Sequence, residues 1–341
     1  MHPFFDLAYS YGGPVTSAKM RQQPEDFQVT ELIDLDLSGV GEHLWVRVRK
    51  QGLTTQELSG ELARWAKVRP NAVGYSGMKD KYAVTEQWFS ITLPGREDPE
   101  PPTAPKWQIT EQSRHSKKLK RGFHTGNHFQ IRLREVDGQP EQVEQRLQQL
   151  KDCGCPNYFG DQRFGRDGDN VESALAMFNG SRRVKQRHLK GVLISAARSH
   201  VFNQLLASRV KRGDWQTPQA GEVMMLAGSR SFFVADEIDE TIQQRLSSGD
   251  VLISGPMWGE GESPASGEIG KLENQLSDQF AEICAGLVEA GLRQERRSLQ
   301  LNLNDLQWRW QEQDLVVEFS LPSGAFATSV LREVADWRAA G

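Results

Sequence analysis

A lone carboxylate between two lysines is the feature of this sequence best suited to chemistry. Residues 77–88 read GMKDKYAVTEQW, with Asp80 flanked by Lys79 and Lys81. A neighbouring cation favours the ionised form of an acid, and Gly77 after the turn-prone residues 73–76 predicts a tight loop that presents Asp80. An ionised, presented carboxylate suits a nucleophile better than a general acid. The local composition also fits a solvated charge cluster on a surface loop.

Residues 77–88 resemble the catalytic motif of the TruD family of tRNA pseudouridine synthases, in which a G-x-K-D loop carries the nucleophilic aspartate. Further segments match motifs of this family in the expected order: PEDFQVTE at 24–31, GNHF at 126–129, NYFGDQRFG at 157–165 and LPSGAFATSVLRE at 321–333. NYFGDQRFG is the most specific of them. The loosest match is Arg21, because the family tolerates lysine or arginine before P-E-D-F. The resemblance spans nearly the whole chain and implies that Asp80 is the nucleophile.

The implied reaction converts the uridine at position 13 of transfer RNA into pseudouridine. It breaks the N1–C1′ glycosidic bond, rotates the detached uracil and joins C5 to C1′, without a redox step or a group carrier. Asp80 would attack C1′ or remove the C2′ proton to give a glycal, and the sequence leaves both routes open. Either route needs an acid that stays ionised and a pocket that excludes water. We expect Lys79 and Lys81 to hold Asp80 ionised if their side chains point inward.

A uridine inside a helix cannot reach such a carboxylate, so it must be flipped out of the RNA. The resemblance implies that Phe27, Asn127, Phe129 and Phe326 bind the flipped uridine, and we also predict Arg21 and Lys79 as substrate-binding residues. An asparagine amide can read the uracil edge, and a phenylalanine ring can stack on the base, at about 1–3 kcal/mol per base. Phe27 and Phe129 lie in alternating strand patterns, so packing in the core stays open for both.

Positive charge is concentrated in one segment although the chain of 341 residues carries a net charge of −4. Residues 112–134 contain no acidic residue and are rich in lysine and arginine. Such a stripe can contact phosphates, and a solvated basic loop is the alternative. The predicted RNA-binding residues are Lys117, Lys118, Lys120, Arg121 and Arg132.

Composition and motifs argue against several other classes of protein. No run approaches the roughly 18 apolar residues that span a bilayer, and residues 1–6 do not resemble a secretory leader, so we expect a cytoplasmic protein. Its three cysteines form no C-x-x-C pair. His124 and His128 have the spacing of a helical metal pair, but Gly126 and the strand pattern from Phe129 disfavour a helix there. With no nucleotide-binding glycine loop either, we expect no metal and no cofactor.

Hydrophobic periodicity predicts the elements that position these residues. Alternation indicates strands at 27–32, 44–48, 88–93 and 129–136, and a hairpin across 306–319. Helices are predicted after Thr54 or Thr55, from Pro140 to Gly154, and from about Gly324. The middle of the chain is mainly helical, with helices expected at 170–178, 189–210 and 272–292.

A β-rich start and a β-rich end around a helical middle indicate one domain inserted into another. We therefore expect an α+β fold, in which a mixed, mainly antiparallel catalytic domain of the pseudouridine synthase type holds an inserted, mainly helical α/β domain. The expected boundaries are 1–154 and 304–341 for the catalytic domain and 155–303 for the insertion. We expect a monomer acting on transfer RNA.

Two other functions are compatible with parts of this pattern. A non-catalytic RNA-binding protein or RNA chaperone would use the pocket as a clamp, although an intact Asp80 motif argues against it. A carboxylate-dependent hydrolase would usually need a second placed acid near Asp80.

Overall fold

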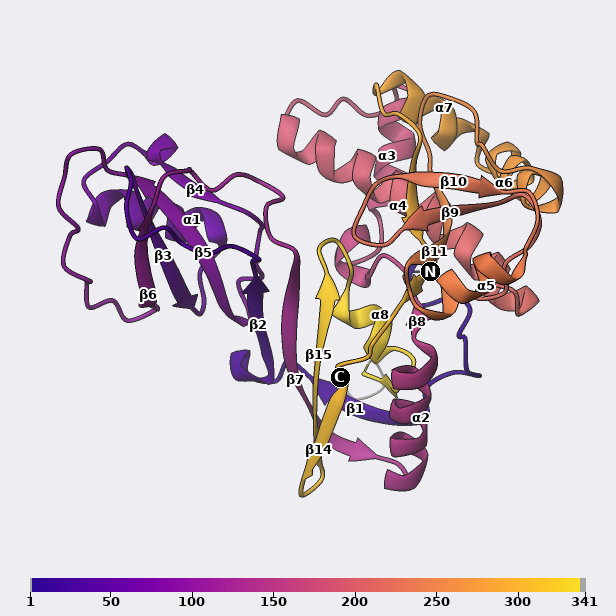
Figure 1. Ribbon diagram of the computed structural model, residues 1–341, viewed down its shortest axis with the longest axis horizontal. Helices are drawn as coiled ribbons and strands as arrows, with labels where there is room; N and C mark the ends of the chain where they lie inside the picture. The colour runs from indigo at the N-terminus through magenta and orange to yellow at the C-terminus, as the bar shows by residue number, and fades with distance from the viewer. Residues whose placement is uncertain (1, 338–341) are drawn as a thin grey trace. The chain divides into compact units, whose positions relative to one another are not determined.

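The computed structural model describes residues 2–337, which pack into two compact units (Figure 1). Unit 1 holds residues 2–14, 152–302 and 325–334, and unit 2 holds residues 15–151, 303–324 and 335–337. Residues 2–14 and 325–334, which the sequence analysis assigns to the catalytic domain, thus pack with the middle of the chain. The functional division into a catalytic and an inserted domain stays a prediction.

Unit 2 is built on a ten-stranded sheet with the central order β14-β15-β7-β2-β5-β3-β6, to which β1, β4 and β16 add at the sides (Figure 1). The strands are β1 (Thr16–Met20), β2 (Phe27–Leu32), β3 (His43–Lys50), β4 (Val73–Tyr75), β5 (Val84–Thr92), β6 (Trp107–His115), β7 (Gly126–Asp137), β14 (Gln307–Gln311), β15 (Asp314–Pro322) and β16 (Ala335–Asp336). Only the β1–β16 and β2–β5 pairs among them are parallel. The predicted α+β class with a mainly antiparallel sheet is confirmed.

Helix α1 (Thr55–Trp65) covers one face of this sheet, against β4 and β5 (Figure 1). Thr54 caps it and forms a capping box with Glu57, which satisfies two otherwise unpaired backbone N–H groups. Leu58 and Leu62 lie one turn apart on its buried side and pack among the apolar side chains of β3 and β5. Each such leucine contributes about 1.5–3 kcal/mol by leaving water. The helix therefore fixes the edge of the sheet from which the Asp80 loop projects.

Unit 1 combines helices with a four-stranded sheet in the order β10-β9-β11-β12 and a two-stranded sheet of β8 and β13. Its strands are β8 (Cys155–Pro156), β9 (Glu222–Leu226), β10 (Phe232–Ala235), β11 (Val251–Met257), β12 (Glu295–Ser298) and β13 (Gln300–Leu301). Its helices are α3 (Asn170–Phe178), α4 (Arg187–Arg212), α5 (Glu240–Ser247), α6 (Gly267–Gln279), α7 (Ala281–Glu289) and α8 (Ala327–Leu331), while α2 (Pro140–Cys153) leads into this unit from unit 2. The long helix α4 packs against α3, α6, α7 and β11.

The chain also forms short 3-10 helices. They are η1 (Pro24–Asp26), η2 (Pro70–Ala72) and η3 (Asp161–Phe164). The predicted helix at 272–292 is wrong as a single element, because the chain breaks at Phe280 (φ −113°, ψ 34°) into α6 and α7. The four-stranded sheet was not located from the sequence. Its strands β9 and β11 are buried along most of their length, so they lack the alternation that marks a half-exposed strand.

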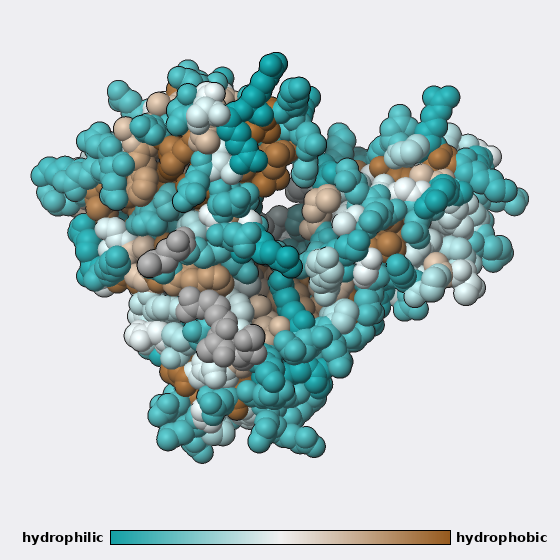
Figure 2. Space-filling model, turned by 180° about the vertical axis from the view of Figure 1, so that it is seen from behind, coloured by the Kyte–Doolittle hydropathy of each residue, from teal (hydrophilic) through white to brown (hydrophobic). Residues whose placement is uncertain are grey.

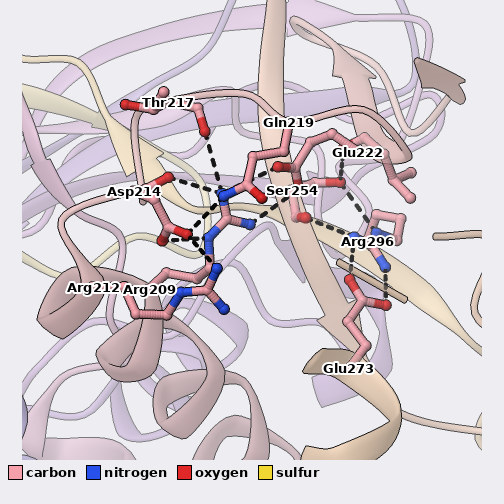
Figure 3. Close-up of polar contacts among 10 residues, drawn as sticks. Arg209, Arg212, Asp214, Thr217, Gln219, Glu222, Ser254, Glu273 and Arg296 are labelled. Atoms are coloured by element: carbon pink, nitrogen blue, oxygen red, sulfur yellow. Dashed lines mark hydrogen bonds and ion pairs between the residues drawn. The ribbon is translucent and has the colours of Figure 1, made fainter. Parts of the chain in front are cut away.

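Buried ion pairs tie the helices of unit 1 to its sheet (Figure 3). Arg209 on α4 contacts Asp214 at 2.8 Å and Glu222 on β9 at 3.1 Å. Arg296 on β12 contacts Glu273 on α6 at 2.9 Å. The side chains of Arg209, Glu222, Arg296 and Glu273 are each at most 2% exposed. Because water does not reach these groups, each charge depends on its ion-pair partner for stabilisation.

Candidate active site

The loop between β4 and β5 (Figure 1) carries Asp80. Its backbone is held by side chains from β3, α1 and β5. The hydrogen bonds that hold it are Gln87 Nε2 to Gly77 O (3.1 Å), Lys79 N to Thr55 Oγ1 (2.9 Å), Lys50 Nζ to Asp80 O (2.9 Å) and Gly52 N to Lys81 O (3.0 Å). Gly74 allows β4 to lie close to the backbone of Leu119, because a Cβ at residue 74 would lie 2.4 Å from the Leu119 carbonyl oxygen. The loop therefore has a defined backbone even though it lacks regular structure.

The Asp80 carboxylate has its two oxygens in different surroundings. Oδ1 accepts a hydrogen bond from the Tyr82 N–H at 3.0 Å, and Oδ2 lies 3.6 Å from Arg21 Nη1. The side chain is 22% exposed, so a substrate atom can reach it. An accessible carboxylate oxygen is what a nucleophile or a base requires.

Arg21 is held in an unusual conformation beside Asp80. Its φ of +58° lies in the left-handed region, which is uncommon for a residue other than glycine. Its guanidinium carbon lies 4.3 Å from the centroid of the Phe27 ring. Such backbone strain, of order 1–3 kcal/mol, persists where the surrounding structure fixes it and is common near functional sites.

The ammonium groups of the lysines next to Asp80 contact side chains other than that of Asp80. Lys79 Nζ lies 3.0 Å from Glu31 Oε1 and 2.7 Å from Asn127 Oδ1, and Lys81 Nζ lies 3.6 Å from Glu57 Oε1. Neighbours in a sequence can point in different directions, and here the cation that contacts the Asp80 carboxylate comes from residue 21.

Lys79, Glu31 and Asn127 form a buried polar cluster behind the loop. The Glu31 side chain is 0% exposed and that of Lys79 is 5% exposed, and the second Glu31 oxygen accepts from the Trp88 N–H. Burial lowers the pKa of Lys79, and the Glu31 carboxylate opposes this shift. Because lysine can only donate, it fixes the oxygen of the Asn127 amide toward itself. The Asn127 NH2 group is therefore oriented as a donor.

The predicted base-stacking phenylalanines take two different positions. Phe27 and Phe129 are buried in β2 and β7, with ring centroids 6.1 Å apart, and Phe129 stacks on Phe319 at 5.6 Å. Their contacts are those of core residues. Phe326 lies in unit 1, where its ring contacts Phe159 with centroids 5.8 Å apart.

His124 and His128 each contact serine side chains. His124 Nδ1 lies 2.7 Å from Ser76 Oγ, and its Nε2 lies 2.9 Å from Ser323 Oγ. His128 Nδ1 lies 3.2 Å from Ser320 Oγ. Burial and the nearby Lys79 charge lower the pKa of His124. His124 precedes β7 and His128 lies within it, so the two are not on a helix, as the sequence indicates.

The basic segment at 116–121 is fixed to the sheet of unit 2. The Lys117 carbonyl accepts from Trp45 Nε1 at 2.9 Å, and the Leu119 N–H donates to Ser90 Oγ at 2.9 Å. Arg121 lies over the Tyr75 ring, with Cζ 4.0 Å from its centroid. A pocket of about 540 Å³ is lined by Ser59, Pro70, Val73, Gly74, Tyr75, Lys118, Leu119, Lys120 and Arg121.

The arginines of β7 are partly neutralised. Arg132 and Arg134 share Asp314 at 3.5 and 3.7 Å, and Arg134 also contacts Asp26 at 2.7 Å. Arg132 therefore contributes less net positive charge than the lysines of the 116–121 segment.

Comparison with known proteins assigns the chain to a family. The family model described as tRNA pseudouridine synthase D (TruD) matches residues 7–170 and 168–334. The chain belongs to the TruD family. It is 45% identical over 333 residues to the tRNA pseudouridine synthase D of Nitrosococcus oceani, covering 96% of this chain and 93% of that protein. It is 44% identical over 333 residues to that of Pseudomonas putida, covering 97% and 94%.

A solved structure of the TruD fold has the same architecture. The crystal structure of a putative tRNA pseudouridine synthase D from Methanosarcina mazei aligns with a TM-score of 0.73 at 21% identity. The alignment covers 96% of this chain and 95% of that chain. The fold expected from the family resemblance is confirmed.

Four residues that position the Asp80 loop were not identified as such from the sequence: Glu31, Lys50, Thr55 and Gln87. The burial of Lys50 could have been recognised from the sequence. It continues the alternation of Leu44, Val46 and Val48, so it occupies the buried face of β3, where an unpaired lysine is costly. Its ammonium donates to the carbonyls of Leu53 and Asp80 at 2.7 and 2.9 Å.

Lys50 should give the protein a specific dependence of stability on pH. Burial lowers the pKa of Lys50 to about 8. The charge of Lys79 also lowers this pKa, whereas the carboxylates of Asp80 and Glu57 raise it. Between pH 8 and the ordinary lysine pKa of about 10.4, the unfolded chain then binds more protons than the folded one. The contribution of Lys50 to the free energy of unfolding therefore rises with pH between these two values, by at most about 1.4 kcal/mol per pH unit.

The measurement is urea unfolding of the wild type and Lys50→Met at pH 7.5 and 9.5. We expect the free energy of unfolding of the wild type to rise relative to that of the variant as pH increases. Lys50→Arg, which keeps its charge, should show no such rise. Parallel pH profiles of the wild type and Lys50→Met would contradict the expectation.

Proposed function

We propose that this protein isomerises the uridine at position 13 of transfer RNA to pseudouridine, with Asp80 as the nucleophile. Membership of the TruD family supports the class of reaction, and the curated relatives carry that name over nearly their full length. The observation that carries the proposal is Asp80 itself. Its carboxylate is accessible, paired with Arg21 and set on a loop whose backbone is held from three elements.

The geometry suits both routes for breaking the N1–C1′ bond. Asp80 Oδ2 would attack C1′ or remove the C2′ proton as the N1–C1′ bond breaks, and Arg21 would stabilise the carboxylate before that step and after its release. The detached uracil then rotates, and C5 bonds to C1′ as the Asp80–C1′ ester breaks or as Asp80 returns the C2′ proton to the glycal. N1 takes up a proton, and the C5 proton leaves last. The oriented Asn127 NH2 group would donate to a uracil carbonyl, and Lys79 would hold that amide in position.

We propose that the Phe326 ring stacks on the flipped uracil. Phe27 and Phe129 are proposed to act from the core, where Phe27 supports the Arg21 guanidinium and Phe129 supports the strand that carries Asn127. Buried rings of this kind fix polar groups in place without touching the base.

RNA binding is proposed for the segment that contains Lys117, Lys118, Lys120 and Arg121, with Arg132 at its margin. We expect the triple variant Lys117→Glu, Lys118→Glu and Lys120→Glu to bind transfer RNA more weakly. Each lost phosphate contact should lower the slope of log affinity against log salt by about one unit. The measurement is a binding titration at several salt concentrations.

A control with the same change of net charge distinguishes direct phosphate contacts from the effect of net charge alone. Lys19, Lys106 and Lys271 are spread over both units, and their reversal to glutamate changes net charge equally. This control should shift affinity modestly and leave the slope nearly unchanged. Equal slopes for the two triple variants would mean that the segment is only a solvated surface.

A non-catalytic RNA-binding protein is the second candidate, and it differs in one measurable respect. Such a protein would bind transfer RNA and leave its uridines intact. A carboxylate hydrolase is less compatible with the site, because Glu31 is fully buried and bonded to Lys79 and Trp88. It is not available as a second acid beside Asp80.

The experiment that tests the proposal uses purified protein and an unmodified transfer RNA transcript, followed by mapping of pseudouridine at nucleotide resolution. We expect one modified site at position 13. A transcript with cytidine at that position is the matched control and should remain unmodified. Pseudouridine elsewhere would leave the reaction class intact and refute the proposed position.

Activity should require no added metal or cofactor, because the isomerisation has no net redox change. Within residues 2–337 there is no cluster of three or more histidine, cysteine or acidic side chains arranged to hold a metal ion. Turnover should survive exhaustive EDTA treatment and dialysis, with monovalent salt and polyamine to keep the RNA folded. Activity lost by this treatment and restored by zinc or magnesium, with the RNA still folded, would contradict the expectation.

We further propose that the protein acts as a monomer in the cytoplasm. Hydrophilic residues dominate the face shown in Figure 2, where hydrophobic residues form small separate patches. Among residues 2–337, no helix is long and apolar enough to cross a bilayer. Sedimentation of the protein with and without transfer RNA would test the monomer.

A further inference from the structure

Arg163 of unit 1 has most of its hydrogen-bonding capacity unused. It lies in η3, inside the NYFGDQRFG segment, with its guanidinium carbon 5.3 and 5.4 Å from the ring centroids of Phe159 and Phe326. Nη1 donates to Ser195 Oγ on α4 at 2.5 Å. Nε is buried and has no hydrogen-bond partner within residues 2–337. Since a guanidinium has five N–H donors, several remain for another acceptor.

The buried arginines of the same unit have carboxylate partners that the half-buried Arg163 lacks. Arg209, Arg296 and Arg332 each form an ion pair with a buried carboxylate. Arg163 forms no ion pair with any carboxylate in the described part of the chain, and burial alone lowers its pKa. Even a half-buried cation without a counter-charge costs folding free energy. Its presence is explained if an anion arrives from outside the protein.

A second guanidinium lies at the same aromatic ring. Arg297 on β12 has its Cζ 4.0 Å from the Phe159 centroid, and its Nη2 donates to Asn157 Oδ1 at 2.5 Å. Burial lowers the pKa of Arg297 to about 9, and repulsion by the Arg163 charge adds to the shift. Positive charge is therefore concentrated around Phe159.

We propose that Arg163, with Arg297 beside it, forms a phosphate subsite that binds one phosphate group of the RNA backbone. The inference rests on the proposed function, because its ligand is part of the proposed substrate. The planar guanidinium fork matches the oxygens of a phosphodiester. The Phe159 and Phe326 rings fix the guanidinium before the ligand binds. A neutral ligand would satisfy the donors but would leave the charge uncompensated.

Arg163→Met distinguishes a phosphate subsite from a structural arginine. Methionine fills a similar volume without the charge, so we expect the Tm of the RNA-free protein to equal or exceed that of the wild type. The Kd for transfer RNA should rise about tenfold at fixed salt, and the slope of log affinity against log salt should fall by about one unit. Arg163→Lys should restore the slope and only part of the affinity, because it lacks the fork.

Arg245→Met is the matched control. It removes the same charge from a half-exposed arginine of unit 1, which is paired with Asp250 at 2.6 Å. Its salt slope should equal that of the wild type.

Inorganic phosphate provides a test that needs neither RNA nor turnover. At constant ionic strength, replacing chloride with phosphate should raise the Tm of the wild type and of Arg245→Met but not that of Arg163→Met. If this holds while the wild type forms no pseudouridine, the proposed function fails and the subsite stands. An unchanged salt slope in Arg163→Met, an equal effect of phosphate on all three proteins, or failure of Arg163→Met to fold would overturn the inference.

Discussion

Asp80→Asn should abolish pseudouridine formation while the protein still folds and binds transfer RNA. The amide keeps the side-chain shape and the hydrogen bond that Oδ1 accepts from the Tyr82 N–H. It cannot form a stable bond to C1′ or take the C2′ proton, so the single-turnover rate should fall about a thousandfold or more. The measurement is pseudouridine formed per transfer RNA with enzyme in excess, alongside the Kd of each protein.

Lys81→Met is the matched control for Asp80→Asn. Lys81 is adjacent in sequence, but its ammonium lies beside Glu57 rather than beside the Asp80 carboxylate. The variant should keep activity within a few-fold of the wild type. A large loss of activity in Lys81→Met would support the charge arrangement expected from the sequence. Residual turnover above a few per cent in Asp80→Asn would move the catalytic role to another residue.

The second large effect is expected on stability, at the buried ion pairs of unit 1 (Figure 3). Arg209→Met leaves the fully buried Glu222 carboxylate without the guanidinium that contacts it at 3.1 Å. We expect the free energy of unfolding to fall by about 3–5 kcal/mol. The measurement is reversible urea unfolding, monitored by fluorescence and circular dichroism.

The double variant Arg209→Met, Glu222→Leu tests the cause of that loss. Removing both charges leaves an apolar pair of similar volume, and such replacements are often neutral or stabilising. Asp214 keeps contacts with Arg212 and Gln219. Most of the lost stability should therefore return. A double variant no more stable than Arg209→Met would show that packing, rather than an unpaired buried charge, accounts for the loss.

Periodicity predicted the elements with one exposed face and failed for those without one. The strand predicted at 27–32 and the helix predicted at 170–178 have the same bounds as β2 and α3. The hairpin expected across 306–319 is formed by β14 and β15. In contrast, β9 and β11 are buried on both faces along most of their length and gave no alternating signal. The helix break at Phe280 was not predicted, because the sequence has no glycine or proline at this position to indicate it.

The motifs located the Asp80 loop but did not reveal which side chains surround it. Arg21 meets Asp80 across nearly 60 residues of sequence, and only the folded chain brings them together. Lys79 is drawn away because Glu31 would otherwise be an unpaired buried charge. Lys50 could have been recognised from its place on the buried face of β3. Its bond to the Asp80 carbonyl could not, because it depends on the path of the loop.

Release of the C5 hydrogen tests the central claim most directly. Joining C5 to C1′ displaces one hydrogen from the uracil to solvent for each pseudouridine formed. With a transfer RNA transcript labelled with tritium at C5 of its uridines, purified wild-type protein should release one equivalent of tritium per RNA, and Asp80→Asn should release none on the same timescale. No release by the wild type, or equal release by both proteins, would contradict the assignment of this chain as an isomerase that acts through Asp80.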